Sequence, residues 1–566
     1  MPLNFVKLAK EQLREKILEA LGVCITNEKL PALPVKNFNI EIPANREHGD
    51  LATNIAMVCA KSFKMSPLSI AQIITENMNF EDTYFSHYNI VSPGFINVFF
   101  KEEWFKDVLL GINNDKNDYG RSNIGLEKKV MVEFVSANPT GPMHLGNARG
   151  GVLGDCLASV LETCDYDVTR EFYVNDAGNQ IYKFGKSLEA RYLQIFKGEE
   201  AVEFPEDGYK GEDITELAKM FSEKYSDEFV EKSSEERCNA LVEFALPINI
   251  EKLKKDLSRY KINYDVWFKE SSLYKNKSVE KIINLFKETD SVYEKDGAIW
   301  FNASKYGAGK DEVLVRANGF STYFAADIAY HYNKFVTRNF EKVINVWGAD
   351  HHGHVARLKS AMNVLGIDSD RLDIILMQLV QLTQKGKTVK MSKRTGKSIT
   401  LVDLLDEVSV DAARFFFNMR EASSHLDFDL GLAVEKSSEN PVYYVKYAHA
   451  RICSILTRAK SGGVSFDIDL FDEQNFDFQI DEERELIKML ALYPVEIETV
   501  ARTYDCSLIT KYAINLASAF HKFYSSCKVV TDDECITNFR LLLCICTKTV
   551  LNNVLSLMKI EAPEKM

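Results

Sequence analysis

Residues 130–135 (VMVEFV) and 139–150 (PTGPMHLGNARG) are the stretch of sequence that decides the fold. The first is a short apolar run of strand length, and the second is a loop rich in glycine and proline. After this loop, apolar residues recur at helix spacing, at Val152, Leu153, Cys156, Leu157, Val160 and Leu161. Another strand-like run follows at 168–174 (VTREFYV). The order strand, loop, helix, strand predicts the beginning of a parallel βαβ sheet, a setting typical of nucleotide-binding folds.

Sheet-like sequence returns only after a long interruption. The next apolar run of strand length in this pattern is 343–347 (VINVW), and it follows an acidic segment at about 190–300. We interpret that segment as an insertion between two halves of one sheet. Towards the N-terminus, helical patterns at 5–21 and 51–63 alternate with two strands expected across 89–100.

The end of the chain has a different pattern. From Val434 onward long helical patterns dominate, for instance at 482–502 and 539–558, and they predict an all-helical domain. A polar stretch at 111–122 is expected to be a linker. The predicted organisation is an α+β domain at 1–115, an α/β domain with a split parallel sheet at 116–430, and a helical domain at 431–566.

Composition narrows the class of protein. The chain has 566 residues, of which 46% are hydrophobic and 27% charged, so it is not a disordered or collagen-like protein. A net charge of −13 excludes a uniformly basic nucleic-acid coat, although a local basic strip can still hold a polyanion. Eleven cysteines form no CxxC pair, which favours reduced thiols and no structural zinc. The charged N-terminus predicts an amphipathic helix, and no apolar run has membrane-spanning length, so we expect a cytoplasmic protein.

The loop at 139–150 is the first candidate site. Its glycines allow a ligand to approach the backbone closely, and the following helix offers free N–H groups to a phosphate. His144 can donate a hydrogen bond or a positive charge to a phosphoryl oxygen, and Asn147 can donate without charge. Alone, the motif is equally compatible with a glycine-rich turn whose histidine caps a helix.

The second candidate is 385–397 (KGKTVKMSKRTGK), in which six of thirteen residues are basic. A cationic loop of this kind can neutralise charge that develops on transferring phosphates. The commoner meaning of such a run is a solvated surface loop.

The two motifs together resemble the HIGH and KMSKS signatures of class I aminoacyl-tRNA synthetases, and the rest of the chain is similar to the arginyl-tRNA synthetase family. The resemblance covers essentially the whole length. It is carried by 48–54 (HGDLATN), 93–97 (PGFIN), 133–142 (EFVSANPTGP), 174–178 (VNDAG), 323–330 (YFAADIAY), 348–353 (GADHHG), 439–451 (ENPVYYVKYAHAR) and 561–566 (EAPEKM). One departure is Asn147, which stands where the signature has its last histidine.

The resemblance implies a Rossmann-type catalytic domain, an additional N-terminal domain that contacts tRNA, and a helical anticodon-binding domain. It implies ATP contacts from His144, Gly146, Asn147, Gly348, Asp350, Lys390, Met391, Ser392 and Lys393, with His144, Asn147, Lys390 and Lys393 catalytic. It also implies Mg²⁺ on the triphosphate, a monomer, and a need for tRNA in the activation step.

Arginine recognition can be argued partly from chemistry. A guanidinium is planar and permanently charged, so its recognition calls for carboxylates. Tyr323 and Asp327 stand four residues apart in a helical pattern and share one face, and Glu133 ends the first strand at the edge where such sheets bind ligands. The resemblance assigns these three to the arginine side chain, and Ser136 and Asn138 to its backbone end. The alternatives are a packed aromatic for Tyr323, and a helix cap or surface ion pair for Asp327.

Two further groups of residues are candidates. Residues 348–354 (GADHHGH) hold three histidines, but a zinc site needs a fourth ligand. The resemblance instead places Asp350 and His351 beside the ribose and the amino acid. In the helical region, Tyr443, Tyr447 and Arg451 combine aromatic faces with a cation, as single-stranded RNA recognition requires.

The expected function is therefore ATP-dependent ligation of L-arginine to its tRNA through an arginyl-adenylate. Three alternatives remain open at this point. They are a synthetase for another amino acid, a small-molecule adenylating ligase of the same fold, and a non-enzymatic tRNA-binding module.

Overall fold

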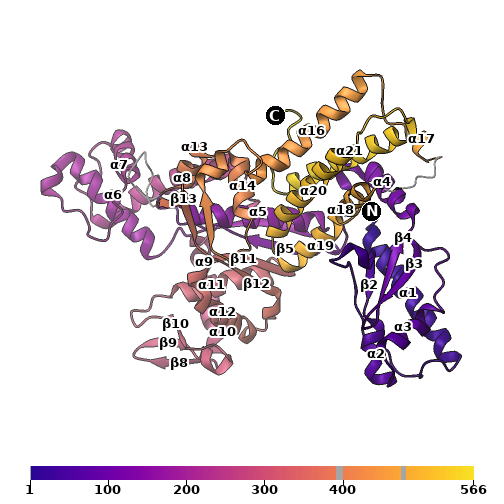
Figure 1. Ribbon diagram of the computed structural model, residues 1–566. Helices are drawn as coiled ribbons and strands as arrows, with labels where there is room; N and C mark the ends of the chain where they lie inside the picture. The colour runs from indigo at the N-terminus through magenta and orange to yellow at the C-terminus, as the bar shows by residue number, and fades with distance from the viewer. Residues whose placement is uncertain (1, 390–398, 473–477, 479) are drawn as a thin grey trace.

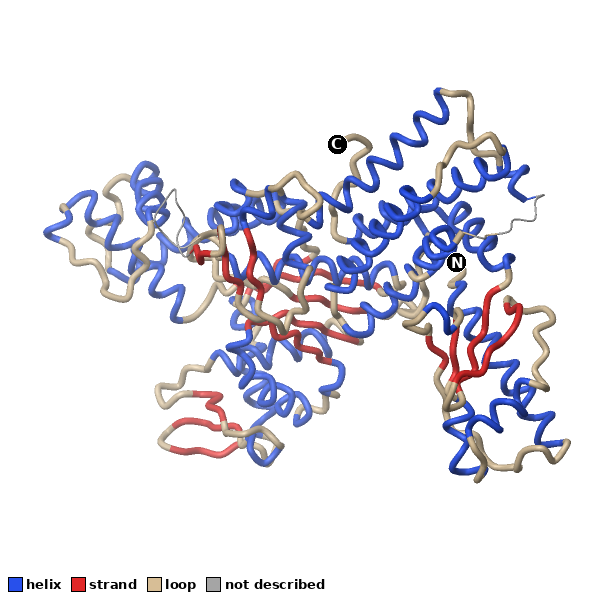
Figure 2. The backbone as a smooth tube through the Cα atoms, viewed as in Figure 1, coloured by secondary structure: helices blue, strands red, loops and turns tan. Residues whose placement is uncertain are grey.

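The computed structural model describes residues 2–389, 399–472, 478 and 480–566. Figure 1 shows a central body with the indigo N-terminal domain on one side and the orange and yellow C-terminal helices above it. Figure 2 shows that most strands gather in the central body, while smaller sheets lie apart from it. The N-terminal sheet, the central sheet and the C-terminal helices therefore lie in different parts of the molecule.

The N-terminal domain is an antiparallel sheet of order β1-β2-β4-β3 packed with helices. Its elements are α1 (Phe5–Thr26), β1 (Ile40–Glu41), β2 (Leu51–Thr53), α2 (Ile55–Phe63), α3 (Pro67–Thr75), β3 (Phe85–Val91), β4 (Phe95–Phe100) and α4 (Glu102–Asp115). The helix expected over 51–63 is wrong in its first turn, because β2 pairs with β1 and β4 there. The linker expected at 111–122 is also wrong in its first part. Helix α4 continues through Gly111, where a β-carbon would lie 2.5 Å from the ring of Phe5.

The central sheet has five parallel strands in the order β12-β11-β5-β6-β7. They are β5 (Lys129–Glu133), β6 (Asp167–Val174), β7 (Val266–Lys269), β11 (Lys342–Gly348) and β12 (Leu372–Met377). The predicted split parallel sheet is confirmed. The chain runs from β5 to β6 in one direction and returns to β11 on the other side of β5. Ligands bind at such a reversal point, outside the carboxyl ends of the strands.

Helix α5 (Leu145–Thr163) crosses from β5 to β6 and is buried along most of its length. A β-carbon at Gly154 would lie 2.3 Å from the ring of Phe134, so only glycine allows this close packing of helix and strand. The close approach fixes the N-terminus of α5 at the carboxyl edge of the sheet.

The segment at 190–300 is more than an insertion. Helices α6 (Asn179–Lys197), α7 (Glu212–Tyr225) and α8 (Ser234–Arg259) share a separate apolar core, and Figure 1 shows α6 and α7 projecting from the sheet. Strand β7 then joins the edge of the central sheet. The expectation of one continuous insertion is therefore corrected, because its middle contributes a strand.

A second group of elements follows β7 and leads back to the sheet. It comprises α9 (Ser271–Lys275), α10 (Ser278–Lys287), β8 (Val292–Lys295), β9 (Ala298–Phe301), β10 (Glu312–Val315), α11 (Tyr323–Tyr332) and a π-helical turn (Asn333–Thr337). Helix α12 (His352–Val364) then connects β11 to β12. Beyond β12 come β13 (Val380–Gln384), β14 (Lys387–Val389), α13 (Leu401–Glu407), α14 (Val410–Asn418), β15 (Leu426–Asp429) and α15 (Leu430–Val434). Strands β14, β13 and β15 form a small separate sheet.

The C-terminal domain is helical, as predicted. Its helices are α16 (Pro441–Ser461), α17 (Ile468–Asp472), α18 (Asp481–Ala491), α19 (Tyr493–Thr503), α20 (Ser507–Ser526) and α21 (Glu534–Leu557). The single helix expected at 482–502 is two helices, because the chain breaks at Leu492, just before Pro494. Among the described residues, α21 is long and apolar enough to cross a membrane by composition, but 72% of its most apolar stretch is buried inside the protein.

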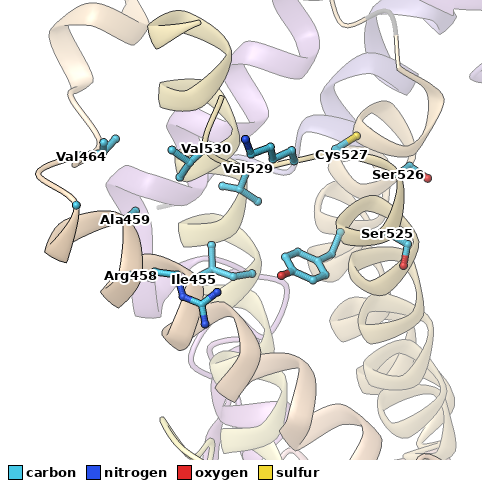
Figure 3. A pocket seen from close by; sticks show the side chains of 12 residues that line it. Ile455, Arg458, Ala459, Val464, Ser525, Ser526, Cys527, Val529 and Val530 are labelled. Carbon is cyan, nitrogen blue, oxygen red and sulfur yellow. The ribbon is translucent and has the colours of Figure 1, made fainter. Parts of the chain in front are cut away.

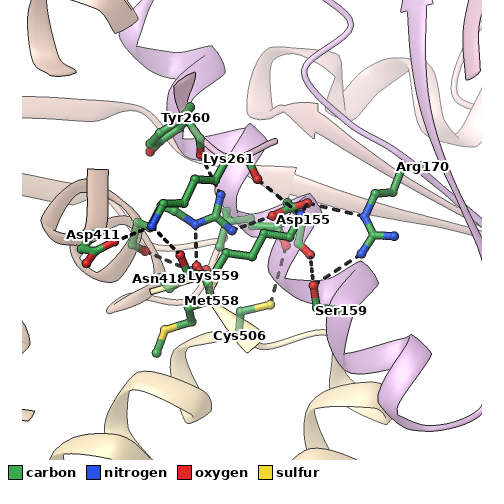
Figure 4. Close-up of polar contacts among 12 residues, drawn as sticks. Asp155, Ser159, Arg170, Tyr260, Lys261, Asp411, Asn418, Cys506, Met558 and Lys559 are labelled. Carbon is green, nitrogen blue, oxygen red and sulfur yellow. Dashed lines mark hydrogen bonds and ion pairs between the residues drawn. The ribbon is translucent and has the colours of Figure 1, made fainter. Parts of the chain in front are cut away.

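Buried charges join the helical domain to helix α5, which packs on the central sheet (Figure 4). Asp155 on α5 is fully buried and pairs with Arg414 of α14 and, at 2.7 Å, with Lys559 just beyond α21. The Arg414 guanidinium also donates to the carbonyls of Tyr260 and Met558. Four elements that are distant in sequence therefore meet around one carboxylate.

Candidate active site

The loop after β5 places polar groups at the carboxyl edge of the sheet. Val135 and Ser136 both adopt left-handed backbone conformations, with φ of 69° and 43°. The Ser136 hydroxyl donates to Glu133 Oε1 at 2.9 Å and accepts from the Tyr173 N–H at 3.2 Å. These contacts hold a strained turn in place, a feature that is common at binding sites. Asn138 follows on the same loop and is half-buried.

The turn at the start of α5 presents His144 to solvent. His144 is the N-cap residue, and its backbone N–H donates to Asn147 Oδ1 at 3.1 Å. The side chain of Asn147 therefore completes the helix cap, and its amide nitrogen remains as a donor. Gly146 has no heavy atom within 4 Å of its β-carbon position, so the backbone here can be approached closely.

The second motif is connected to the first. Thr400 forms an isolated antiparallel bridge with His144, and the Leu401 N–H donates to the Met143 carbonyl at 2.9 Å. Strand β14 ends at Val389 on the other side of the motif. Lys390, Met391, Ser392 and Lys393 themselves lie outside the described residues. The chain nevertheless leaves this motif directly beside the phosphate-binding candidate His144.

Residues after β11 occupy the facing strand end. A β-carbon at Gly348 would lie 2.4 Å from Asp350 Oδ1, so the Asp350 carboxylate folds back over this glycine. Asp350 and His351 are exposed, with 3.8 Å between Oδ2 and Nε2. His354 points elsewhere, because its Nε2 lies 2.6 Å from Asp327 Oδ2. The histidines of this segment therefore do not converge on one point.

Tyr323 and Asp327 lie on one face of α11, as their spacing predicts. The Tyr323 hydroxyl accepts from the Asn179 N–H at 2.9 Å and lies over Gly178, where a β-carbon would be 2.8 Å from that oxygen. Tyr323 also lines a cavity of about 520 Å³ together with Tyr274 and Arg316. A cavity of this size is suited to a small ligand.

The Asp327 carboxylate is held in its charged form. Burial opposes its ionisation, but the hydrogen bonds from His331 and His354 place its pKa well below the usual value. An aspartate of this kind stays negative at neutral pH and can pair with a cation.

Glu270 is a candidate that the sequence analysis missed. It follows β7 at the carboxyl edge of the sheet, is 1% exposed, and its Oε2 has no hydrogen-bond partner in the described part of the chain. Its pKa is raised to about 7, mainly by burial and further by the negative charges of Asp176 and Asp327. The available signal was an acid directly after the run 266–269 (VWFK), which was assigned to the insertion.

Three carboxylates surround one tyrosine of β6. Burial first, and then the negative charges of Glu270, Asp327 and Glu133, raise the pKa of Tyr173 far above its usual value. These acids come from three different elements, and because Glu133 pairs with Lys334, the negative charge of the pocket comes from Asp327 and, when it is ionised, Glu270. Such a pocket is suited to a compact organic cation.

A second surface lies on the helical domain. Tyr443 and Tyr447 stack with their ring centres 6.3 Å apart, and Tyr447 lies 6.0 Å from the ring of His521. The Arg451 guanidinium lies over the Tyr524 ring at 4.8 Å and donates to its hydroxyl at 3.0 Å. The three residues expected to bind RNA are therefore brought together along α16, facing α20.

A cavity of about 690 Å³ continues this surface towards the tip of the domain (Figure 3). Val529 and Val530 face Ile455 across it, and Arg458 and Lys528 add positive charge. Apolar walls with a few cations suit an unstacked base of a single-stranded nucleic acid.

Comparisons with known proteins agree with this geometry. Three family models match the chain: the arginyl tRNA synthetase N terminal domain at 9–100, the catalytic domain of class I (R) tRNA synthetases at 110–430, and the DALR anticodon binding domain at 445–566. Two curated relatives named arginine–tRNA ligase, from Acetivibrio thermocellus and Caldanaerobacter subterraneus, are 53% and 52% identical. Both alignments cover 100% of each chain.

The structure of Thermus thermophilus arginyl-tRNA synthetase has a similar fold, with a TM-score of 0.74 at 20% identity over 98% of this chain and 100% of that chain. The catalytic-domain model alone spans more than half of the sequence, and the curated relatives match it from end to end. The chain therefore belongs to the arginyl-tRNA synthetase family of class I aminoacyl-tRNA synthetases.

Proposed function

We propose that this enzyme ligates L-arginine to its tRNA at the expense of ATP. A carboxylate oxygen of arginine attacks the α-phosphorus of ATP, and pyrophosphate leaves. A hydroxyl of the terminal tRNA ribose then attacks the carbonyl carbon of the arginyl-adenylate, and AMP leaves. The observation that carries this proposal is the acidic pocket around Tyr173, which lies on the same sheet edge as the glycine-rich turn at His144.

The two ends of arginine require different partners. Asp327, Glu270 and Tyr323 are proposed to hold the guanidinium. Glu133 is buried and pairs with Lys334, so its part in binding arginine is proposed to be indirect. Ser136, Asn138 and His351 are proposed to hold the backbone end of the amino acid.

We assign the nucleotide to the part of the carboxyl edge of the central sheet that lies near the start of α5 and the end of β11. His144, Gly146 and Asn147 are proposed to contact the phosphates, and Gly348 and Asp350 the adenosine. The motif at 390–393, outside the described residues, is proposed to neutralise charge that grows on the phosphates in the transition state. Mg²⁺ would be held mainly by the triphosphate oxygens and water, so the chain needs no dedicated cage for it.

The flanking domains are proposed to hold tRNA. We propose the division 1–115, 116–430 and 431–566, with Tyr443, Tyr447 and Arg451 contacting the anticodon loop. Their common orientation on α16 and the cavity beyond them support this assignment. We further propose a cytoplasmic monomer that activates arginine only when tRNA is bound, as the resemblance to the family implies.

Replacing Asp327 tests the arginine pocket. Asp327→Asn keeps the shape but removes the charge, so arginine recognition should weaken by about 1.5–3 kcal/mol, which is an increase in the arginine KM of roughly 10- to 150-fold. ATP–pyrophosphate exchange in the presence of tRNA gives both KM values. The matched control is Asp350→Asn, which should raise the KM for ATP instead. Equal changes in both KM values for Asp327→Asn would contradict the assignment.

Replacing Tyr447 tests the RNA surface. Tyr447→Ala removes a stacking face and should weaken tRNA binding by about 1–3 kcal/mol. Filter binding at several salt concentrations measures this loss, and single-turnover transfer at saturating tRNA should remain close to that of the wild type. Tyr306 has a similarly exposed ring on the opposite part of the molecule, so Tyr306→Ala is the control. Unchanged tRNA affinity for Tyr447→Ala would move the anticodon contact elsewhere.

A further inference from the structure

We propose that Lys334, Asn345 and His331 form a buried hydrogen-bond relay that positions the Asp327 carboxylate for arginine. This inference rests on the proposed role of Asp327, and it adds three positioning residues that lie behind the pocket wall. The relay joins Glu133 at one end to Asp327 at the other.

The relay begins at a buried lysine. Lys334 is fully buried in the π-helical turn that follows α11, and its ammonium pairs with Glu133 Oε2. The same ammonium lies 3.1 Å from Asn345 Oδ1 and 4.0 Å from the centre of the Tyr330 ring. A π-helical turn adds one residue to the helix and so redirects the side chains that follow, a feature found frequently at functional sites. Here Lys334 points inward, towards Glu133 at the end of β5 and Asn345 in the middle of β11.

The charge of Lys334 determines the orientation of Asn345. An ammonium group has three donors and no acceptor, so the amide oxygen of Asn345 must face it. The amide nitrogen then faces the other way, and Nδ2 lies 2.9 Å from His331 Nε2. Because this nitrogen can only donate, Nε2 of His331 must be the acceptor and carries no proton.

The position of the proton on His331 determines which hydrogen bonds Asp327 accepts. With Nε2 unprotonated, the proton of the neutral imidazole is on Nδ1, which lies 2.8 Å from the Asp327 carbonyl and 3.2 Å from Oδ1 of the same residue. His354 contacts the other oxygen, Oδ2, at 2.6 Å. The Nδ1–H of His331 is therefore shared between the carbonyl and Oδ1 of Asp327, and together with His354 it restrains the orientation of the carboxylate. A carboxylate offers about four acceptor positions, so it can still accept N–H groups from a guanidinium.

The relay is internal and well sheltered. Lys334 and Asn345 are 0% exposed and His331 is 1% exposed, so none of the three reaches the ligand directly. They act by fixing the direction of one charged group before the substrate arrives. Such preorganisation reduces the cost of binding and requires partners with fixed donors and acceptors.

Two substitutions of His331 separate this role from simple packing. In His331→Asn the amide nitrogen can occupy the place of Nδ1 and still donate to Asp327. In His331→Gln the amide lies nearer to the place of Nε2. The relay predicts that the arginine KM of the glutamine variant exceeds that of the asparagine variant by about tenfold or more, with the KM for ATP unchanged in both. A packing role predicts the reverse order, because glutamine is closer to histidine in volume.

A third variant tests the relay independently if the His331 variants fold poorly. Asn345→Asp keeps the acceptor for Lys334 but removes the donor to Nε2, so the arginine KM should rise by about tenfold. His449 is a buried histidine of the helical domain whose Nδ1 also contacts a backbone carbonyl, Pro563 O, at 2.8 Å. His449→Asn and His449→Gln are the matched controls and should leave the arginine KM unchanged.

All constants come from ATP–pyrophosphate exchange at saturating tRNA. An asparagine variant no better than the glutamine variant overturns the relay, and so does an unchanged arginine KM in Asn345→Asp. If Asp327→Asn itself leaves the arginine KM unchanged, then the proposed role of Asp327 fails instead. The two failures are therefore distinguishable.

Discussion

Glu270 and Asp327 are both carboxylic acids of one pocket, yet their surroundings shift their pKa values in opposite directions. Burial and two neighbouring negative charges raise the pKa of Glu270 to about 7. Two histidines hold the pKa of Asp327 well below its usual value in spite of burial. At neutral pH Asp327 is therefore always negative, whereas Glu270 gains its negative charge when a cationic ligand binds.

The raised pKa of Glu270 predicts pH-dependent arginine binding. Below about pH 7 the buried carboxyl is protonated in the empty enzyme, and it must lose this proton to pair with a guanidinium. We expect kcat/KM for arginine to fall as the pH drops from 8 to 6, approaching tenfold per pH unit below 7. Glu270→Gln should remove this dependence and weaken arginine binding across the range. A flat wild-type profile, measured with the ATP profile as control, would exclude this role.

The same shift affects stability. The folded state binds more protons than the unfolded state between the ordinary pKa of 4.5 and about 7. The contribution of Glu270 to the free energy of unfolding therefore decreases as the pH rises through this window, and Glu270→Gln should abolish that decrease.

At the scale of elements, the first turn of α5 combines two tasks. Its unpaired N–H groups make a site for phosphate, and they also need a cap. Asn147 contributes to the cap by accepting from the His144 N–H. An asparagine in the place of the signature histidine is therefore structurally useful without a positive charge.

Substitutions of Asn147 can separate the two tasks. Asn147→Ala removes the acceptor and should lower the free energy of unfolding by about 1 kcal/mol. Asn147→Asp keeps the acceptor and the stability, but its negative charge should repel the phosphates and slow adenylate formation by at least about tenfold. Thermal unfolding and single-turnover activation measure the two effects. If the aspartate variant activates arginine at the normal rate, then no phosphate lies near this residue.

At the scale of the whole molecule, buried ion pairs and hydrogen bonds hold the helical domain against helices α5 and α14. The residues just beyond α21 contact Asp155 on α5 and Arg414 on α14, and Lys446 of α16 pairs with Asp411 of α14 at 2.6 Å. A chain that ended near Leu426 would lose these partners and expose α5. Removing the helical domain is therefore expected to destabilise the central α/β domain.

Removing the Arg414–Asp155 ion pair should lower the free energy of unfolding substantially. Arg414→Met leaves the buried Asp155 carboxylate without its main partner, so we expect a loss of about 3–5 kcal/mol and a clearly lower unfolding midpoint. Lys16 forms an exposed pair with Glu19 on α1, so Lys16→Met should leave the midpoint unchanged. Equal midpoints for Arg414→Met and the wild type would show that the domains are held together without this charge cluster.

The spacing of apolar residues and the positions of glycine and proline were sufficient to predict many of the helices and strands. A strand within 130–135, the helix after it and the strand at 168–174 follow from hydrophobic period and from glycine and proline in the loop, although the first strand ends at Glu133 and Val135 already lies in the turn. The same holds for the helical end of the chain. These features depend on residues that are close in sequence, so the sequence by itself determines them.

The pocket depends on contacts that only the tertiary structure decides. Strand β7 is recognisable only because it pairs with β6, and Glu270 becomes a site residue only through that pairing. Likewise, Lys334 meets Glu133 across 201 positions of sequence, and the orientation of Asn345 follows from that meeting. Burial and long-range pairing set the charge of these groups and the direction of their hydrogen bonds, and neither is encoded in the local period of the chain.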